Sequence, residues 1–446
     1  MKNQRVNDVN TRSMGVRHKG ISVAVAIVSI SALAVTGCSS ARTGSSGTNV
    51  GKVTLTLLNH YDLPPQSTGL TALISQWNKE NPKIQVKQQV VFFDDLLTTM
   101  TVRQTGGQGA DMLSAYALWG GQLASNGVLA KPPTDVAADI KNSYSAAASA
   151  AVMGPGGQVY GYPTEFNTYA LFYNKKLLRQ AGYSAPPQNW DELKVMAKKM
   201  TTKDSAGNIK IEGISLVQDG DNPTAHPFMS LLNAAGGKFL DPDGNLAKGN
   251  EAKAVLQLES DLSASGATHP AVLPTKLFPN SQVAMAIQAT WWVGTLKTQM
   301  KDKYTQDVGV VNVPGPNTGQ KGSLAYAFFM GVNSKSKNQA QAWKFLTWLN
   351  SQKQGDGVTR MGAFVANMGA IPSRKTDAAI LGPEAMKADP NMVPFYDAGN
   401  FAMAESSAAN AYKAKTSLHK NLMKIFVSHD PVEQTFASMS AEIAAK

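Results

Sequence analysis

The sequence of 446 residues contains a single cysteine, Cys38. One cysteine excludes an intrachain disulfide and any zinc site built on cysteine pairs. The six histidines show no metal-ligand spacing, and the chain lacks the His-Glu-x-x-His, Gly-x-Ser-x-Gly and phosphate-loop motifs. We therefore expect no metal, no cofactor and no enzymatic activity, although catalytic groups brought together from distant segments would leave no motif.

Charge is sparse and scattered. Charged residues make up 16% of the chain, and the formal net charge is +11, of which +4 lies before Cys38. The remaining positive charge forms no basic block, so we expect no nucleic-acid partner. A hydrophobic content of 43% excludes global disorder.

Long apolar runs are also lacking. The run from Ile21 to Val35 is uncharged and contains 15 residues. A helix of that length spans ~22 Å, short of the ~30 Å hydrocarbon core of a bilayer. After a basic N-terminus, such a run is typical of a signal peptide. An uncleaved anchor with an incidental cysteine is the alternative.

The residues Val35-Thr36-Gly37-Cys38 end this run, and a Ser- and Gly-rich stretch follows them. They resemble the lipobox of bacterial lipoproteins. The resemblance implies a signal peptide over residues 1–37, lipid attachment at Cys38 and a flexible tether over residues 38–51. It also implies that the body is held at the extracytoplasmic face of the bacterial cell membrane.

Hydrophobic periodicity predicts an α/β fold. Val53, Leu55 and Leu57 alternate as in a strand, the residues from Leu70 to Trp77 have helical spacing, and a second strand starts at Ile84. This strand-helix-strand unit indicates a parallel sheet. We expect further strands over residues 211–217 and 308–313, and helices over residues 190–200, 226–235, 338–350 and 408–446, the last with a break near 428–431. Asn189 is the predicted N-cap of the first of these helices. This number of elements requires more than one sheet.

Several stretches, in order along the chain, resemble extracellular solute-binding proteins of family 1, which include maltose-binding-protein-like sugar receptors. They are Val159-Tyr160-Gly161-Tyr162-Pro163, Pro186-Pro187-Gln188-Asn189-Trp190-Asp191-Glu192-Leu193, Trp291-Trp292 and Ala370-Ile371-Pro372-Ser373. The resemblance implies a type II-like periplasmic-binding-protein fold, a hinged clamshell of two lobes. Lobe 1 would comprise residues 52–163 plus 321–365, and lobe 2 residues 164–320 plus 366–446. It also implies a monomer that captures a small-molecule solute and delivers it to the permease subunits of an ABC importer.

A sugar site needs flat apolar rings beside planar polar groups. The candidates come from loops that follow strands and from positions matched to the family, including the segment after Val159 where, by the resemblance, the chain crosses from one lobe to the other. These are Tyr61, Asp62, Tyr116, Trp119, Glu165, Asn167, Tyr173, Trp291 and Tyr326. Each could instead be an ordinary core or loop residue. Of the adjacent tryptophans, we expect Trp291 to face the ligand and Trp292 to lie in the core. Ser114 and Ala117 stand where the maltose-binding pattern has an aromatic residue and an acid, which disfavours maltodextrin.

Three functions compete. The first is a lipid-anchored sugar receptor for an importer. The second is a receptor of the same fold for a polyol, polyamine or peptide. The third is a surface hydrolase. A polyamine needs several carboxylates and a phosphorylated ligand needs arginines, and the candidate loops are poor in both. The sequence therefore favours a neutral sugar.

Overall fold

The computed structural model describes residues 51–153, 158–217, 220–241, 243–270, 273–406, 408 and 410–445. The apolar run, Cys38 and the tether up to residue 50 lie outside the described residues. Within the described part, no helix is both long enough and apolar enough to cross a membrane.

The predicted strand-helix-strand unit is confirmed. β1 (Val53–Asn59) and β2 (Ile84–Val90) pair in parallel, and α1 (Gln66–Glu80) connects them. The buried face of α1 carries Leu70, Ile74 and Trp77. The indole Nε1 of Trp77 donates a hydrogen bond to the carbonyl oxygen of Ile84, at 2.8 Å. This bond ties the end of the helix to the start of the second strand.

Two long strands organise the main sheet. β4 (Gly161–Asn174) and β11 (Leu324–Val332) pair antiparallel, and β3 (Met112–Tyr116) pairs antiparallel with β11 and parallel with β1. The strand order is β12-β4-β11-β3-β1-β2, with β12 formed by Ile371–Pro372. β13 (Met403–Ala404) pairs in parallel with the first two residues of β11.

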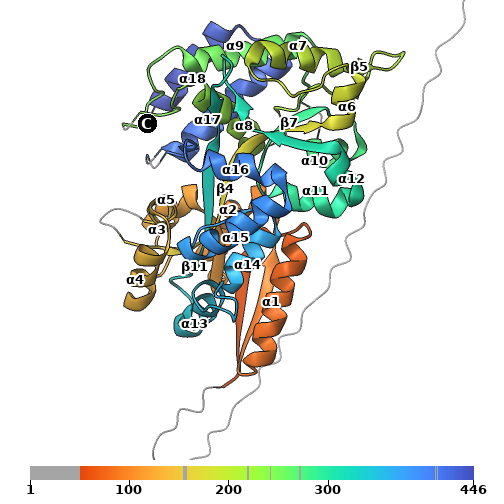
Figure 1. The fold of residues 1–446 in the computed structure, drawn as a ribbon. Helices are drawn as coiled ribbons and strands as arrows, with labels where there is room; N and C mark the ends of the chain where they lie inside the picture. The colour runs from red at the N-terminus through yellow and green to blue at the C-terminus, as the bar shows by residue number, and fades with distance from the viewer. Residues whose placement is uncertain are drawn as a thin grey trace, which may run out of the picture. The chain divides into compact units, whose positions relative to one another are not determined.

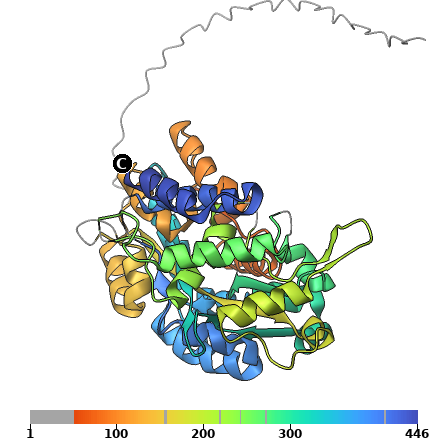
Figure 2. The same cartoon turned by 90° about the horizontal axis from the view of Figure 1, so that it is seen from above.

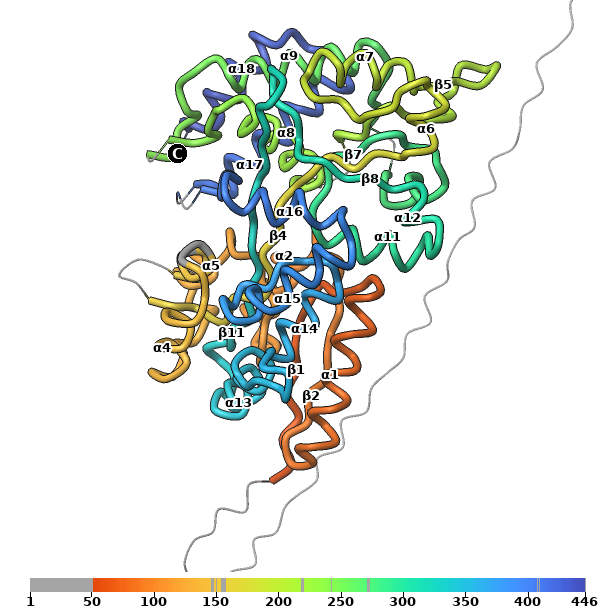
Figure 3. The backbone as a smooth tube through the Cα atoms, in the orientation of Figure 1, coloured from red at the N-terminus to blue at the C-terminus, as the bar shows by residue number. Residues whose placement is uncertain are grey.

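β4 belongs to both halves of the fold. Up to Thr168 it pairs with β11 and β12, and from Tyr169 onward it pairs with β7 (Met285–Ala289) and β8 (Val308–Val311). We call the half around β1, β2 and β3 the first lobe and the half around β7 and β8 the second lobe. Figure 3 shows β4 and β11 running from one to the other. The residue boundaries expected for the lobes stay a prediction.

More than one sheet is present, as expected, but nine strands share a single sheet because β4 and β11 continue through both lobes. The described residues add two sheets of two strands each. One pairs β5 (Thr202–Lys203) with β6 (Ile209–Ile211), and the other pairs β9 (Val313–Pro314) with β10 (Lys321–Gly322).

Helices surround the sheet (Figure 1). Besides α1, those near the first lobe's strands are α2 (Phe93–Thr105), η1 (Ala117–Trp119), α3 (Gly120–Ser125), α4 (Thr134–Ser143), α5 (Ala146–Ala151), α13 (Gln339–Asn350) and α14 (Arg360–Asn367). The others are α6 (Lys175–Gln180), α7 (Trp190–Met200), α8 (Asp221–Ala234), α9 (Glu251–Ala264), α10 (Pro274–Leu277), η3 (Phe278–Asn280), α11 (Trp292–Met300), α12 (Asp302–Asp307), α15 (Lys375–Ala388), η4 (Pro390–Met392), α16 (Val393–Ala398), α17 (Ala411–Met423), η5 (Lys424–Ser428) and α18 (Val432–Ala444). α17 packs on α8 and α18, and α18 packs on α9, so the blue C-terminal helices lie beside green ones in Figure 2.

Two local expectations need correction. The strand expected over residues 211–217 ends with β6 at Ile211, and only isolated bridges follow it, at Glu212 and Ser215. Gly213 lies so close to α7 that an added Cβ would come within 2.0 Å of a backbone carbonyl oxygen, and this close approach interrupts the strand. Asn189 caps α7 as predicted. In a capping box, Glu192 would accept from the backbone N–H of the cap residue Asn189. Its carboxylate instead accepts from the backbone N–H of Gln188.

Candidate functional site

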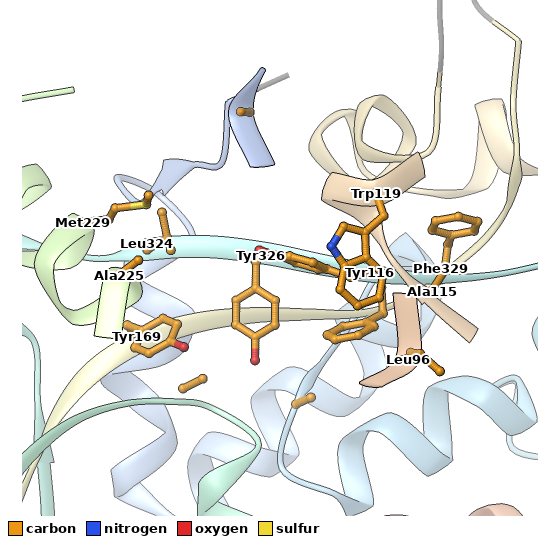
Figure 4. Packing of buried hydrophobic residues seen from close by; sticks show 14 of the residues in the cluster. Leu96, Ala115, Tyr116, Trp119, Tyr169, Ala225, Met229, Leu324, Tyr326 and Phe329 are labelled. Carbon is orange, nitrogen blue, oxygen red and sulfur yellow. The ribbon is translucent and has the colours of Figure 1, made fainter. Parts of the chain in front are cut away.

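Tyrosine and tryptophan side chains from β3, η1, β4 and β11 meet where the two lobes adjoin. The ring centroid of Tyr326 lies 6.0 Å from that of Tyr116 and 5.9 Å from that of Tyr169. The Trp119 ring lies 5.4 Å from Tyr116. Figure 4 shows Tyr326 between Tyr169 on one side and Tyr116 with Trp119 on the other. Sheet register explains the meeting, because Tyr326 pairs with Asn167 of β4, and Phe328 pairs with Tyr116 of β3.

The loop after β1 and the start of α2 extend this group. His60 stacks on Phe328 with ring centroids 4.4 Å apart, and Phe93 stacks on Trp119 at 5.2 Å. We call His60, Phe93, Tyr116, Trp119, Tyr326 and Phe328 the aromatic cluster. Burial lowers the pKa of His60 to about 3, so its imidazole is neutral at physiological pH.

A buried carboxyl group lies beside this cluster. The hydroxyl groups of Tyr61 and Thr164 each donate a hydrogen bond to Oε2 of Glu165, at 2.8 Å. Burial raises the pKa of Glu165 to about 7, although both hydrogen bonds act in the opposite direction. Glu165 can therefore exchange a proton near neutral pH.

His226 of α8, Glu405 just after β13 and Lys415 of α17 form what we call the charge network. Oε1 of Glu405 lies 3.0 Å from Nζ of Lys415 and 3.1 Å from Nε2 of His226. Tyr116 of the first lobe joins it, because its hydroxyl group donates to Glu405 and accepts from Lys415. The network thus connects the two lobes.

The protonation states in the network follow from its contacts. Burial alone would raise the pKa of Glu405, but the Lys415 ammonium and the His226 hydrogen bond outweigh it and hold that pKa at about 2. Burial, helped by Lys415, lowers the pKa of His226 to about 4. A neutral His226 places its proton on Nε2, which faces the carboxylate, and leaves Nδ1 to accept from the Tyr169 hydroxyl group at 2.8 Å.

Several buried polar atoms of the aromatic cluster and of β4 have no hydrogen-bond partner among the described residues. They are Nδ1 of His60, Nε1 of Trp119 and Oδ1 of Asn167. Buried polar atoms are nearly always paired in folded proteins. Unpaired polar atoms also occur deep in the core, for example Nε1 of Trp292. The three atoms are candidates for contact with a ligand because they also lie where the lobes adjoin.

An open cavity of about 570 Å³ borders the charge network. Glu405 and Lys415 form part of its wall, together with Leu118 from η1 and residues of α8 and the loop after it. Its size falls within the range typical of small-molecule sites. Among the described residues, no group of three or more His, Cys, Asp or Glu side chains could hold a metal ion.

Most of the candidates identified from the sequence come together. Tyr61, Tyr116, Trp119, Glu165, Asn167 and Tyr326 are all buried where the lobes adjoin. Trp291 is half-buried and packs against the hydrophobic core that includes Tyr326. Trp292 is fully buried between Phe172 and Phe278, as predicted for a core residue.

Two candidates are not buried in this group. Tyr173 is near the far end of β4, where it pairs with Met285 and its ring covers Gly309. A strand rises about 3.3 Å per residue, so Tyr173 is about 20 Å along the strand from Asn167. Asp62 is exposed in the loop before α1.

The sequence reasoning missed His226, Glu405 and Lys415. One signal was available for Lys415. It lies on the same helical face as Ala411, Leu418 and Leu422, all of which are buried. A charged residue on an apolar helix face is rarely buried without a partner. Neither Glu405 nor His226 stands in a pattern that identifies its partner.

Comparison with known proteins identifies the family. The family model for bacterial extracellular solute-binding proteins matches residues 62–356, more than half of the chain. A binding protein of Brucella abortus is 27% identical over 310 residues, covering 67% of this chain and 71% of its own. The multiple sugar-binding protein of Streptococcus mutans is 23% identical. The alignment covers 73% of this chain and 77% of that protein.

Solved structures agree in fold. The GacH receptor of Streptomyces glaucescens superimposes with a TM-score of 0.73 at 21% identity, covering 87% of this chain and 97% of the receptor. A protein solved with mannotriose, CpMnBP1, gives a TM-score of 0.73 at 22% identity and covers 88% of this chain and all of its own. The fold is the two-lobe fold of maltose-binding-protein-like receptors, and the chain belongs to the bacterial extracellular solute-binding protein family.

Proposed function

We propose that the protein is a carbohydrate receptor of an ABC importer, anchored through a lipid on Cys38 at the extracytoplasmic face of the bacterial cell membrane. In this role it captures a sugar between its lobes and delivers it to the permease subunits. The observation that carries the proposal is the aromatic cluster, in which unpaired buried polar atoms lie among flat rings.

This combination matches the chemistry of a sugar. A pyranose presents apolar C–H faces, which pack on aromatic rings, and hydroxyl groups, which both donate and accept hydrogen bonds. Nε1 of Trp119 is a donor and Oδ1 of Asn167 is an acceptor, so the two atoms complement hydroxyl groups. The name of the Streptococcus mutans relative supports the same ligand class.

A neutral ligand fits better than a charged one. The Lys415 ammonium already donates to Glu405, Tyr116 and Asn222. These bonds use its three N–H groups and leave none for an anionic ligand. Glu165 already accepts from two hydroxyl groups. A hydrolase would need two carboxyl groups free to act on one bond. Glu405 is held in its ion pair with Lys415, which supports binding without turnover.

The test is a binding screen of the purified chain from residue 39 onward. A thermal-shift series with neutral sugars, polyols, polyamines and peptides should show stabilisation by at least one sugar. A ligand at 100 times its Kd adds about 2.7 kcal/mol to the free energy of unfolding. Calorimetry should then give a stoichiometry of one, and chromatography of the incubated sugar should show no hydrolysis.

Stabilisation by polyamines or peptides alone, or turnover of the sugar, would contradict the proposal. Trp119→Phe keeps an aromatic ring but removes the unpaired indole N–H, so it should weaken sugar binding. Trp190→Phe is the matched control, because its indole N–H already donates to the carbonyl oxygen of Pro314, outside the aromatic cluster.

A further inference from the structure

The outer surface of α6 carries three cationic side chains. Lys175, Lys176 and Arg179 share one face of this helix, because their spacing along the chain places them within one arc of the helix. The opposite face packs inward through Leu177 and Leu178. α12 contacts α6, and Figure 1 shows the two helices at the edge of the second lobe.

Two further cations come from the start of α12. Lys301 directly precedes this helix, Lys303 lies in its first turn, and both side chains are exposed. The two helices are joined where Nζ of Lys175 donates a hydrogen bond to the carbonyl oxygen of Thr305, at 3.2 Å. One continuous surface thus carries five cations. We call this surface the basic patch, and its members are Lys175, Lys176, Arg179, Lys301 and Lys303.

The basic patch is not neutralised by its surroundings. Asp302 and Asp307 are the carboxylates of the two helices, so five cations stand against two anions. Within the described part of the chain, none of the five cations forms an ion pair. By contrast, Lys253 on α9 pairs with Glu433 at 2.7 Å. The patch therefore presents an excess of positive charge to whatever approaches it.

The patch also lacks the apolar centre of a protein interface. Among the described residues, none of the large apolar side chains that are exposed lies on α6, α11 or α12. Protein interfaces typically have an apolar core and are depleted of lysine. An anionic membrane surface needs no such core, because it attracts lysine and arginine through its charge alone. The composition of the patch therefore fits lipid headgroups better than a protein partner.

We propose that the basic patch binds anionic phospholipid headgroups and so holds the second lobe against the membrane. This inference goes beyond sugar binding and draws on the lipid anchor proposed for Cys38. Residues 38–50 connect that cysteine to the described body. Thirteen residues span at most about 45 Å, so the anchored body stays close to the headgroups. At the high effective concentration that an anchor provides, a weak electrostatic attraction suffices to orient the body.

Vesicle flotation tests the proposal on the chain from residue 39 onward, which carries no lipid. Val50–Lys446 form one compact unit, so this chain contains the whole folded body. The protein should float with vesicles made of equal parts phosphatidylglycerol and phosphatidylcholine, and it should not float with phosphatidylcholine alone. Raising the salt concentration from about 0.05 M to about 0.5 M should release it, because salt screens exposed charges.

A triple variant tests the patch itself. Lys176→Gln, Arg179→Gln and Lys303→Gln together remove three exposed charges. Each lysine or arginine near an anionic membrane strengthens partitioning about fivefold, so the triple variant should partition roughly tenfold to 100-fold more weakly. Its thermal melt should match that of the wild type, because the three side chains are exposed.

The matched control removes the same charge from the first lobe. Lys337→Gln, Lys344→Gln and Lys353→Gln lie in or beside α13 and are exposed. This variant should float nearly as well as the wild type. An equal loss in both triple variants would show that only net charge matters and would overturn the patch.

Two other results would also overturn the proposal. One is failure of the folded wild-type body to float with the anionic vesicles. The other is flotation of the patch variant equal to that of the wild type, which would leave an acidic protein segment as the alternative occupant. Neither result bears on the proposed sugar binding or on the lipid at Cys38, because flotation of this chain uses no sugar and no anchor.

Discussion

Lys415 and Glu405 form an ion pair in which Nζ and Oε1 are 3.0 Å apart, and their side chains are only 1% and 10% exposed. A buried ion pair of this kind gives up much of its Coulombic gain in desolvation. Loss of one partner, however, leaves the other charge buried and unpaired, which is strongly destabilising. The pair therefore makes the charge network sensitive to single substitutions.

Lys415→Met should lower the free energy of unfolding by about 3–5 kcal/mol, because the carboxylate of Glu405 then stays buried without its cation. Urea denaturation followed by circular dichroism measures the change. Lys420→Met on the same helix is the control. Its ion pair with Glu442 is exposed, so its loss should cost no more than about 1 kcal/mol. The double variant Lys415→Met, Glu405→Gln should regain part of the loss, and equal instability of the single and double variants would contradict the pairing argument.

Glu165 should give the stability a measurable pH dependence. Its pKa is raised to about 7 in the folded protein, from 4.5 in the ordinary carboxyl group. Between these values the folded protein holds a proton that the unfolded chain has released. The free energy of unfolding should therefore fall as pH rises from about 4.5 to about 7, and this contribution should level off above pH 7.

Glu165→Gln removes the titrating group, so the difference in free energy of unfolding between wild type and variant should decrease over that window, by on the order of 3 kcal/mol. Urea titrations at a series of pH values give this difference. Groups such as His226 titrate in both proteins and cancel. A difference that is constant with pH would show that Glu165 is already ionised in the folded state.

The two adjacent tryptophans should respond in opposite ways to alanine. Trp291→Ala should weaken sugar binding by roughly 30-fold or more, since loss of an aromatic anchor commonly costs about 2 kcal/mol or more. It should lower the Tm of the ligand-free protein only slightly, because the ring is half-buried.

Trp292→Ala should instead destabilise the ligand-free protein by about 3–5 kcal/mol, as a fully buried ring is lost between Phe172 and Phe278. Its affinity for the sugar should stay near that of wild type. Calorimetric titration and thermal melts of both variants make the comparison. Normal binding together with early melting in Trp291→Ala would reverse the assignment.

Cys38→Ala should prevent lipid attachment. The full-length protein expressed in a bacterium should partition into detergent, and the variant should appear either in the aqueous phase or as an unprocessed precursor of higher mass. Ser39→Ala is the control variant. It changes the neighbouring residue and should partition as the wild type does. Identical mass and partitioning of Cys38→Ala and wild type would end the lipoprotein assignment.

Local elements were largely predictable, because each depends on neighbouring residues. The alternation in Val53–Leu57 and the helical spacing of Leu70 and Trp77 reflect which face of each element is buried. The helix cap at Asn189 is likewise a local hydrogen bond. The prediction failed beyond Ile211, where Gly213 packs directly against α7, a contact that strand periodicity does not report.

The candidate site was predictable in part. Tyr116, Asn167 and Tyr326 were identified as separate candidates, and sheet register is what brings them together. Tyr173 has the same residue type and family match as better candidates, but its distance along β4 removes it from the cluster.

The sequence by itself determined the α/β class, the family resemblance and the aromatic and polar residues available to a ligand, since these follow from local periodicity and ordered motifs. Only the tertiary structure decided that Lys415, Glu405 and Tyr116, which lie up to 299 residues apart, share one buried network. It also decided that the cavity adjoins that network. The physical reason is that burial and pairing of charges depend on which distant segments pack together, and local sequence carries no record of those partners.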